Sequence, residues 1–433
     1  MTLREGLSVG ARHRLFIGGC DSVELANMYG TPLYVMDEAS VRKNCRAFVR
    51  AMAEHAPEGS VYYASKALCV TAILRLAQQE GLGVDVVSGG ELQTALQAGI
   101  PMDRVMYHGN VKTEAEMTMA VRLGVGRVVI DSLDEILPLQ QAAQREGRVQ
   151  SVLLRINPGV EAHTHQAVQT ARADCKFGVG IDDGEALRGI KQILACKNLK
   201  LTGLHTHIGS QLFSMQPYVQ AMDKLTDLMV LATVVIGCEL EELDLGGGFG
   251  ARYVDGDEPP VIYTSIRYIA QTLRSMCSRK GMRPPRLMVE PGRSIVAEAG
   301  VHAVKRLPGV RTYVALDGSM ADNPRPMLYQ SPYTALLANR AGEPEAETVA
   351  LAGRACESGD VLMWEARLPR VEVGDLVAML SEGAYQYSMA SHVNRIPNPA
   401  MVLAYYGKSA PIVERERFED MPRMDRMPYW LGT

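Results

Sequence analysis

A lysine, a glutamate and a glycine-rich turn stand out because each follows a short apolar run that is typical of a buried strand. Lys66 follows VYYAS, Gly246 to Gly248 follow LDL, and Glu290 follows LMV. A partly desolvated lysine amine can form a Schiff base with an aldehyde, and consecutive glycine N–H groups can hold a phosphate. A carboxylate can keep a ring nitrogen protonated. Together the three groups indicate pyridoxal 5′-phosphate more specifically than any one of them does.

Two histidines in the segment HTHIGSQ allow more than one kind of site. His205 and His207, at i, i+2 spacing on one face of a strand, could hold a metal. No third ligand stands at a familiar spacing, so we expect no metal. The alternatives are a buried structural histidine or an imidazole that stacks on a flat cofactor ring. Ser210 of the same segment adds a hydroxyl near the predicted phosphate cradle.

Eight short apolar runs must position these residues. The runs are Val61–Ala64, Val84–Val87, Val105–His108, Val128–Asp131, Val152–Ile156, Thr202–His205, Leu243–Leu245 and Leu287–Glu290. The stretches between them, such as TAILRLAQQEG and GGELQTALQAG, have the i, i+3, i+4 apolar spacing of helices and end in glycine. Eight such units predict a (β/α)8 TIM barrel, in which polar residues at the carboxyl ends of the strands form the active site.

The rest of the chain has a different pattern. From about residue 301, strand-like segments such as VHAVKR, RTYVAL and DLVAML alternate with turn residues, and LFIGG and PLYVMD are similar pieces near the N-terminus. We therefore expect an α/β protein with a mostly-β C-terminal domain that also takes in the N-terminal segment. The expected parts are residues 1–37 as that segment, 38–300 as the barrel and 301–433 as the β domain.

Composition excludes several classes of function. Lys and Arg total 45 against 49 Asp and Glu, so the chain lacks the positive excess of a nucleic-acid-binding protein. The sequence contains no run of 18 apolar residues, so we expect no membrane-spanning helix. The N-terminus lacks the apolar stretch of a signal peptide. Eight cysteines without CxxC spacing are typical of reduced thiols in a cytoplasmic protein.

Ordered motifs over nearly the whole chain resemble those of bacterial diaminopimelate decarboxylases. They are YASKAL, DVVSGGEL, HGN, RINPGVEAHTH, DCKFGV, HTHIGSQ, LDLGGGFG, EPGRSIV, DGSMADNPRPMLY, GRACESGD and GAYQYSMAS. The resemblance implies the alanine-racemase-like fold, a barrel plus a β domain. It also implies decarboxylation of meso-2,6-diaminopimelate to L-lysine and CO2 through a pyridoxal-phosphate aldimine, the last step of lysine biosynthesis. Val111 and Cys175 depart from the family pattern, which puts only fine detail in doubt.

The resemblance also implies a role for each site residue. The catalytic residues would be Lys66 as Schiff-base lysine, His207 stacked on the ring, Glu290 on the ring nitrogen and Cys356 as proton donor. In this family the cysteine reaches the site of the partner chain, which implies a homodimer with shared active sites. The cofactor-binding residues would be Lys66, Asp85, Arg155, His207, Ser210, Gly247, Gly248, Glu290, Pro291, Gly292, Arg293 and Tyr385. The substrate-binding residues would be Arg293, Arg325, Tyr329, Glu357 and Tyr385.

Other interpretations stay open. Lys66 could be a solvated surface residue, and Cys356 could be a small buried thiol. The role of Glu290 could be limited to a structural ion pair with Arg293. The nearest rival activity is a same-fold decarboxylase of D-lysine, D-ornithine or arginine. Arg325 with Tyr329 disfavours it, since those substrates bring no distal carboxylate. A racemase and a catalytically dead homologue that binds a partner are the remaining alternatives.

Overall fold

The computed structural model describes residues 3–160, 175–182, 184–306 and 313–431. These form two compact units: a barrel unit, Val41–Arg252 with Asp257–Val296, and a β unit, Met1–Ser40 with Tyr253–Gly256 and Ala297–Thr433. Parts of three predicted features lie outside the described residues, namely positions 161–165 of RINPGVEAHTH, 174 of DCKFGV and 311–312 of RTYVAL. The expected domain boundaries, at 37/38 and 300/301, stay a prediction.

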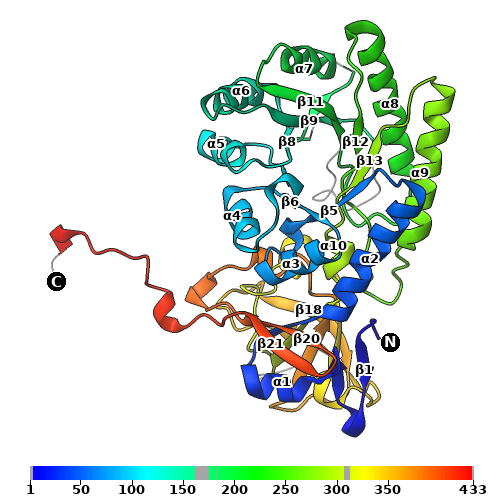
Figure 1. The fold of residues 1–433 in the computed structure, drawn as a ribbon. Coiled ribbons are helices and arrows are strands. Elements are labelled where there is room, and N and C mark those ends of the chain that lie inside the picture. The colour runs from blue at the N-terminus through cyan, green and yellow to red at the C-terminus, as the bar shows by residue number, and fades with distance from the viewer. Residues whose placement is uncertain (1–2, 161–174, 183, 307–312, 432–433) are drawn as a thin grey trace. The chain divides into compact units, whose positions relative to one another are not determined.

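The barrel unit is a closed ring of parallel strands (Figure 1). In order around the ring they are β5 (Ser60–Ala64), β6 (Gly83–Val86), β7 (Val105–Tyr107), β8 (Arg127–Ile130), β9 (Gln150–Asn157), β11 (Leu199–His205), β12 (Glu242–Asp244) and β13 (Arg286–Val289). The ring closes because β13 pairs with β5, and β10 (Val179–Gly180) adds to β9. Each predicted apolar run overlaps one of these strands, so the predicted barrel is confirmed.

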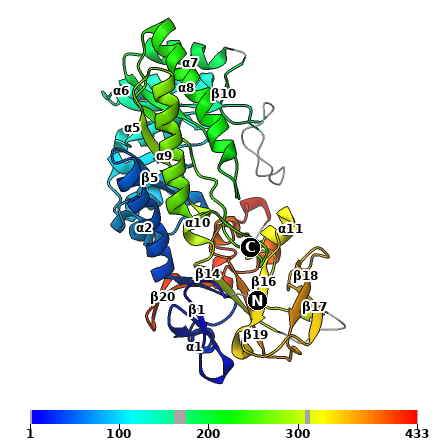
Figure 2. The same cartoon turned by 90° about the vertical axis from the view of Figure 1, so that its right-hand side faces the viewer.

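Helices follow the strands as the periodicity predicts. They are α2 (Glu38–His55), α3 (Thr71–Gln79), α4 (Gly89–Gln97), α5 (Glu114–Leu123), α6 (Ile136–Arg145), α7 (Glu185–Leu194), α8 (Gln216–Ile236), α9 (Ile262–Arg279) and the short α10 (Arg293–Val296). Helix α5 has a clear start and end. Thr113 and Glu116 form a reciprocal capping box at its N-terminus, and Gly124 ends it with a φ of 74°. Helices α8 and α9 pack side by side (Figure 2).

Side chains fill the inside of the barrel. Tyr62, Met106, Val129, Leu153 and Met288 come from five different strands and form one buried cluster. Such a cluster makes the interior a packed core and leaves the two ends of the strands as the places where polar groups can gather.

The β unit is built from both ends of the chain. Its six-stranded sheet has the order β16 (Thr334–Leu337), β19 (Leu376–Leu380), β14 (Gly300–Lys305), β4 (Leu33–Asp37), β20 (Ala400–Tyr405) and β21 (Lys408–Val413). Two three-stranded sheets consist of β1 (Leu7–Val9), β2 (Leu15–Ile17) and β3 (Cys20–Asp21), and of β15 (Tyr313–Ala315), β17 (Glu347–Ala352) and β18 (Val361–Leu368). The helices are α1 (Ser22–Tyr29) and α11 (Arg325–Tyr329). Strand β4 confirms that the mostly-β part takes in the N-terminal segment.

Two expectations drawn from composition concern the whole chain. Within the described ranges, no helix combines the length and apolar character that crossing a bilayer requires. All eight cysteines lie in described residues, and all are free thiols.

Candidate active site

A buried carboxylate lies at the carboxyl ends of the barrel strands. Glu290 follows β13, and its Oε2 is 3.3 Å from Nε2 of His205, the last residue of β11. Its Oε1 is 2.6 Å from Nε2 of His108, which follows β7. Burial favours a raised pKa for Glu290, but the two imidazoles outweigh burial and hold the pKa well below its usual range. Glu290 is therefore ionised at neutral pH.

One oxygen of this carboxylate lacks a hydrogen bond. The contact between Glu290 Oε1 and His108 does not have hydrogen-bond geometry, so Oε1 has no donor among the described residues. Leaving a buried acceptor unpaired costs about 1–3 kcal/mol. The partners found for Glu290 are histidines, while the side chain of Arg293 donates to Ser210. The sequence alternative of a Glu290–Arg293 ion pair therefore does not describe this site.

The two histidines of HTHIGSQ do not share a strand face. Strand β11 ends at His205, and His207 lies beyond it, where Nδ1 accepts a hydrogen bond from Gly247 N at 3.1 Å. His108, His205 and Glu290 lie close together instead. Each offers one atom that could bind a metal, and these three atoms lie within 4.8 Å of one another. Burial lowers the pKa of His205 to about 4, so its ring is neutral at pH 7. Thus His205 contacts Glu290, whereas His207 is hydrogen-bonded to the glycine turn.

Lys66 and Asp85 lie on neighbouring strands, near the same end of the barrel as Glu290. Lys66 is half-buried in the short 3-10 helix Ser65–Ala67 that follows β5, and Asp85 is buried in β6, which pairs with β5. Burial raises the pKa of Asp85 to about 6, against the lowering effect of charge on His108 and Lys66. Asp85 Oδ1, 3.7 Å from His108 Nε2, has no hydrogen-bond donor among the described residues. Lys66 is therefore at the site and is not a fully solvated surface residue.

The glycine turn after β12 leaves no room for side chains. Gly246 and Gly248 have φ of 67° and 106°, a region that favours glycine. A Cβ on Gly247 would stand 2.3 Å from the backbone oxygen of Glu290. Burial, together with charge on Lys66 and Arg155, lowers the pKa of His207 well below its usual range. A neutral imidazole therefore lies against a turn made of bare backbone.

Ser210 and Arg293 lie beside this turn. A Cβ on Gly248 would stand 2.6 Å from Gly209 O, which places the segment of Ser210 against the glycines. Arg293 is buried, and its Nε and Nη2 donate to Ser210 Oγ at 3.2 and 3.0 Å. The preceding Pro291 accepts a hydrogen bond from Ala64 N at 3.1 Å, and a Cβ on Gly292 would stand 2.9 Å from Ala64 O. The PGR segment thus packs against the strand that leads to Lys66.

Arg155 is held in place by residues that sequence reasoning did not select. Its Nη1 is 3.0 Å from Oδ1 of buried Asp131, and its guanidinium stacks 4.4 Å from the ring centroid of Phe177. Glu135 Oε2 accepts from Asp131 N at 2.9 Å and from Lys112 Nζ at 2.7 Å. This buried network fixes the end of β8, which carries Asp131, relative to Arg155 on β9.

Two further residues were missed although they lie in recognised motifs. His108 belongs to HGN and Asp244 to LDLGGGFG, yet neither was given a role. Burial and the negative charge of Glu290 raise the pKa of Asp244 well above its usual range, and its Oδ1 accepts from Gly246 N at 2.8 Å. The acid form of Asp244 is therefore favoured, next to the ionised Glu290. The signal that could have found both is their position at strand ends beside assigned residues.

The β unit brings together three of the predicted substrate residues. Arg325 begins α11, and its guanidinium lies 5.1 Å from the ring centroid of Tyr329 and 5.6 Å from that of Tyr385. Its Nε donates to Tyr333 Oη at 3.0 Å, and the same oxygen accepts from Gln386 Nε2 at 2.8 Å. The buried arginine is thus fixed in orientation between aromatic rings.

Cys356 and Glu357 lie in the turn between β17 and β18. Cys356 is exposed, so the alternative of a small buried thiol is wrong. Its backbone N donates to Asn394 Oδ1 at 2.6 Å, and Glu357 Oε1 accepts from Ser358 Oγ at 3.3 Å. In the described part of the chain, no hydrogen bond or ion pair joins either residue to Arg325 or Tyr329.

Comparison with known proteins agrees with this geometry. Residues 38–297 match the family model "Pyridoxal-dependent decarboxylase, pyridoxal binding domain". Diaminopimelate decarboxylase of Bacillus subtilis is 44% identical over 424 residues, which is 97% of this chain and 96% of the relative. The crystal structure of diaminopimelate decarboxylase from M. jannaschii in complex with L-lysine is similar with a TM-score of 0.93 and 34% identity, covering 99% of this chain and 100% of that one. The enzyme from Helicobacter pylori, also complexed with L-lysine, gives a TM-score of 0.85 and 30% identity, covering 94% and 99%.

Proposed function

The chain belongs to the diaminopimelate decarboxylase family of pyridoxal-dependent decarboxylases, and from that premise we propose that it converts meso-2,6-diaminopimelate to L-lysine and CO2. The substrate has two α-amino acid centres, and the reaction removes the carboxylate from the D-centre. The cofactor of this proposal is pyridoxal 5′-phosphate. When bound, it supplies the electron sink that accepts the electron pair left by CO2.

The observation that carries the proposal is the unpaired Oε1 of buried Glu290. It is an acceptor at the barrel end that also holds the half-buried Lys66 and the glycine turn. A protonated ring nitrogen would satisfy this oxygen, and the low pKa of Glu290 favours proton retention by the ring. The backbone of Gly247 and Gly248, which a Cβ would obstruct, suits a phosphate. The residues present therefore fit the cofactor.

Each remaining residue at this end has a task that its environment supports. Lys66 would hold the aldehyde carbon, with Asp85 beside it to exchange a proton with its amine. His207 is neutral and flat, so it can cover one face of a ring. Ser210 Oγ and the backbone from Glu290 to Arg293, together with Tyr385, would hold the phosphate. Arg155, fixed by Asp131, would face the ring oxygen.

Substrate selection is assigned to the far end of the substrate. Arg325, oriented by Tyr333 and flanked by Tyr329, would bind the distal carboxylate, and Arg293 would help to orient the carboxylates. Glu357 would accept the distal ammonium. Buried polar groups that a shorter substrate leaves unpaired make such discrimination strong. This arrangement favours diaminopimelate over D-lysine, D-ornithine or arginine.

The proposal includes a homodimer with two shared sites. An exposed thiol at Cys356 is available to a second copy of the chain, and two-fold symmetry would form two equivalent sites. In each site the cysteine of the neighbouring chain would return a proton to Cα after CO2 leaves. The free state of all eight cysteines supports action in the reducing cytoplasm.

A CO2-release assay tests the reaction. Purified protein reconstituted with pyridoxal 5′-phosphate is given meso-diaminopimelate, D-lysine, D-ornithine and L-arginine in parallel. We expect CO2 from meso-diaminopimelate alone, with L-lysine as the other product. Equal or faster release from any of the other three would replace the proposed substrate.

Two variants test the assigned residues. Lys66→Ala should lose the visible absorption of the lysine-bound cofactor, whereas Lys200→Ala, an exposed lysine on β11, should keep it. Mixing inactive Lys66→Ala and Cys356→Ala chains should restore one intact site per heterodimer. Absence of recovery in a verified heterodimer would refute the shared site while leaving the decarboxylase assignment untouched.

A further inference from the structure

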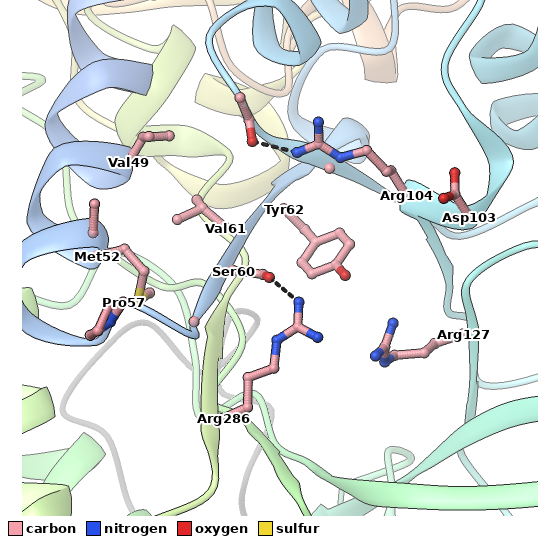
Figure 3. Close-up of a pocket in the computed structure, with 14 residues that line it drawn as sticks. Val49, Met52, Pro57, Ser60, Val61, Tyr62, Asp103, Arg104, Arg127 and Arg286 are labelled. Atoms are coloured by element: carbon pink, nitrogen blue, oxygen red, sulfur yellow. Dashed lines mark hydrogen bonds between the residues drawn. The ribbon is translucent and has the colours of Figure 1, made fainter.

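The amino-terminal ends of the barrel strands line a cavity of about 440 Å³ (Figure 3). Its wall is made by residues at the starts of β5, β6, β8 and β13 and by the inner side of α2. These strand ends are opposite to those that carry Glu290 and the glycine turn. The cavity therefore lies outside the candidate active site, and nothing in the proposed decarboxylation uses it.

Positive charge exceeds negative charge around this cavity. Its lining includes Arg104, Arg127 and Arg286, while Asp103 is the one carboxylate among the lining residues and is exposed. Glu242 lies next to the arginines, but its Oε2 already accepts from Arg127 Nε at 2.6 Å. A single buried carboxylate, Glu242, thus faces two of these guanidinium groups, those of Arg127 and Arg286, while Arg104 donates to Gly81 O.

The acceptor capacity of Glu242 is largely taken up. Arg127 Nη2 donates to Oε1 as well, and Thr202 Oγ1 donates to Oε2 at 2.7 Å. Arg286 Nη1 is 3.7 Å from Oε1, which is an ion pair without a hydrogen bond. Glu242 carries one negative charge against the two positive charges of Arg127 and Arg286, so these three side chains together keep an excess positive charge.

Two donors near the cavity are not used. Arg286 Nη2 donates to Ser60 Oγ, but Nε is buried without a partner among the described residues. Tyr62 is a buried residue whose hydroxyl has no hydrogen-bond partner in the described ranges. Figure 3 shows its ring pointing into the cavity, with the hydroxyl end toward the side where Arg127 and Arg286 lie. Unpaired donors next to excess positive charge are what an oxyanion would satisfy.

We propose that this cavity binds a small oxyanion, a phosphate or a carboxylate group, through Arg286 and the Tyr62 hydroxyl, with Arg104 adding positive charge. The amino-terminal end of such barrels ordinarily serves stability. The Arg127–Glu242 pair and the core packing of the Tyr62 ring fill that role here, while Arg286 Nε and the Tyr62 hydroxyl make no hydrogen bond within the described residues. The proposal does not depend on the activity at the opposite end of the strands.

Isothermal titration with inorganic phosphate, and in a separate arm with succinate, tests the site. The protein is first saturated with pyridoxal 5′-phosphate so that the glycine turn is occupied. We expect at least one probe to bind, about tenfold or more weakly in Arg286→Gln. Arg283→Gln removes an exposed arginine three residues away that does not line the cavity, and it should bind as the parent does. The preferred probe distinguishes a phosphate from a carboxylate ligand.

Further variants keep the test decisive. Tyr62→Phe removes only the hydroxyl, so this variant should fold and should bind the anion a few times more weakly than the parent. If Arg286→Gln does not fold, the affinity of Tyr62→Phe tests the proposal. Absence of heat with either probe up to about 10 mM would overturn the proposal. So would unchanged affinity in both variants. Loss of binding in Arg293→Gln but not in Arg286→Gln would assign the anion to the glycine turn, which also overturns it.

Discussion

At the carboxyl ends of the barrel strands, no lysine or arginine among the described residues bonds to the buried acids Glu290 and Asp244. At the amino ends, by contrast, Arg127 donates two hydrogen bonds to the buried Glu242. Burial and neighbouring negative charge raise the pKa of Asp244. Burial acts in the same direction on Glu242, but Arg127 and Thr202 outweigh it and lower the pKa. One end therefore keeps acceptors unpaired, and the other keeps its acceptor saturated.

The difference teaches how one barrel separates function from stability. Unpaired buried polar groups cost free energy and persist where a ligand completes them. A complete ion pair returns part of its desolvation cost and needs no ligand to complete it. Substitutions at the two ends should therefore affect different measurements.

The largest effect is expected at Glu290. Replacement by Gln removes the charge that keeps a ring nitrogen protonated, so kcat for CO2 release should fall about a thousandfold or more, which equals about 4 kcal/mol. Glu241→Gln, an exposed carboxylate on the segment before β12, is the control and should retain full kcat. A fall of less than tenfold in Glu290→Gln would contradict the division between the two ends.

Glu242→Gln should change stability and leave chemistry alone. It leaves the half-buried Arg127 with no fully charged partner, which costs about 3 kcal/mol in the free energy of unfolding. Urea unfolding measures this loss, and kcat per folded molecule should stay within about twofold. Glu241→Gln again provides the neighbouring control, and equal stability of the two variants would count against the saturated pair.

Asp85→Asn should stabilise the protein in a pH-dependent way. The folded pKa of Asp85, about 6, lies above the ordinary 3.8, so ionisation of the buried carboxyl opposes folding. This penalty is fully present above pH 6 and vanishes as pH falls below about 4. The free energy of unfolding of the variant should therefore be about 3 kcal/mol higher than that of the parent at pH 8 and equal to it at pH 4. Exposed Asp103→Asn serves as the control, and a gain that did not depend on pH would exclude this cause.

The smallest effect is expected at Thr202. Replacement by Val keeps the shape and removes one hydrogen bond to Glu242, while Arg127 still holds the carboxylate. The free energy of unfolding should fall by about 1 kcal/mol without any change in kcat. A measured loss as large as that of Glu242→Gln would mean that the hydroxyl, and not Arg127, stabilises the carboxylate.

The barrel could be predicted from sequence because parallel strands buried on both faces give continuous apolar runs. The β unit is harder to predict, because none of the strand-like pieces seen in the sequence covers β1, β3, β16, β18 or β21. Strand β18 carries the charged Glu365 and Arg367 on exposed positions, and β21 contains Pro411, which fits only because this strand lies at a sheet edge. Charged residues and proline interrupt the apolar pattern from which strands are predicted.

The candidate site could be predicted in residue type but not in electrostatics. Lys66, Glu290 and the glycine turn follow recognisable strands, so their placement could be inferred. The opposite pKa shifts of Glu290 and Asp244 could not be inferred, because they depend on burial and on histidines supplied by other strands. Whether the residues of the β unit act in this site stays a prediction.

Strand β4 has a consequence for synthesis of the chain. Its residues pair on one side with β14 and on the other with β20, so that Leu33 lies opposite Ala400. The apolar segment LYVMD therefore emerges from the ribosome long before β14 or β20 has been synthesised. The whole barrel unit is synthesised after β4 and before these two strands. Until then two bare strand edges are open to other nascent chains. Shielding of residues 33–37 by a chaperone should thus raise the yield of folded protein, and chains that stop before β20 should aggregate.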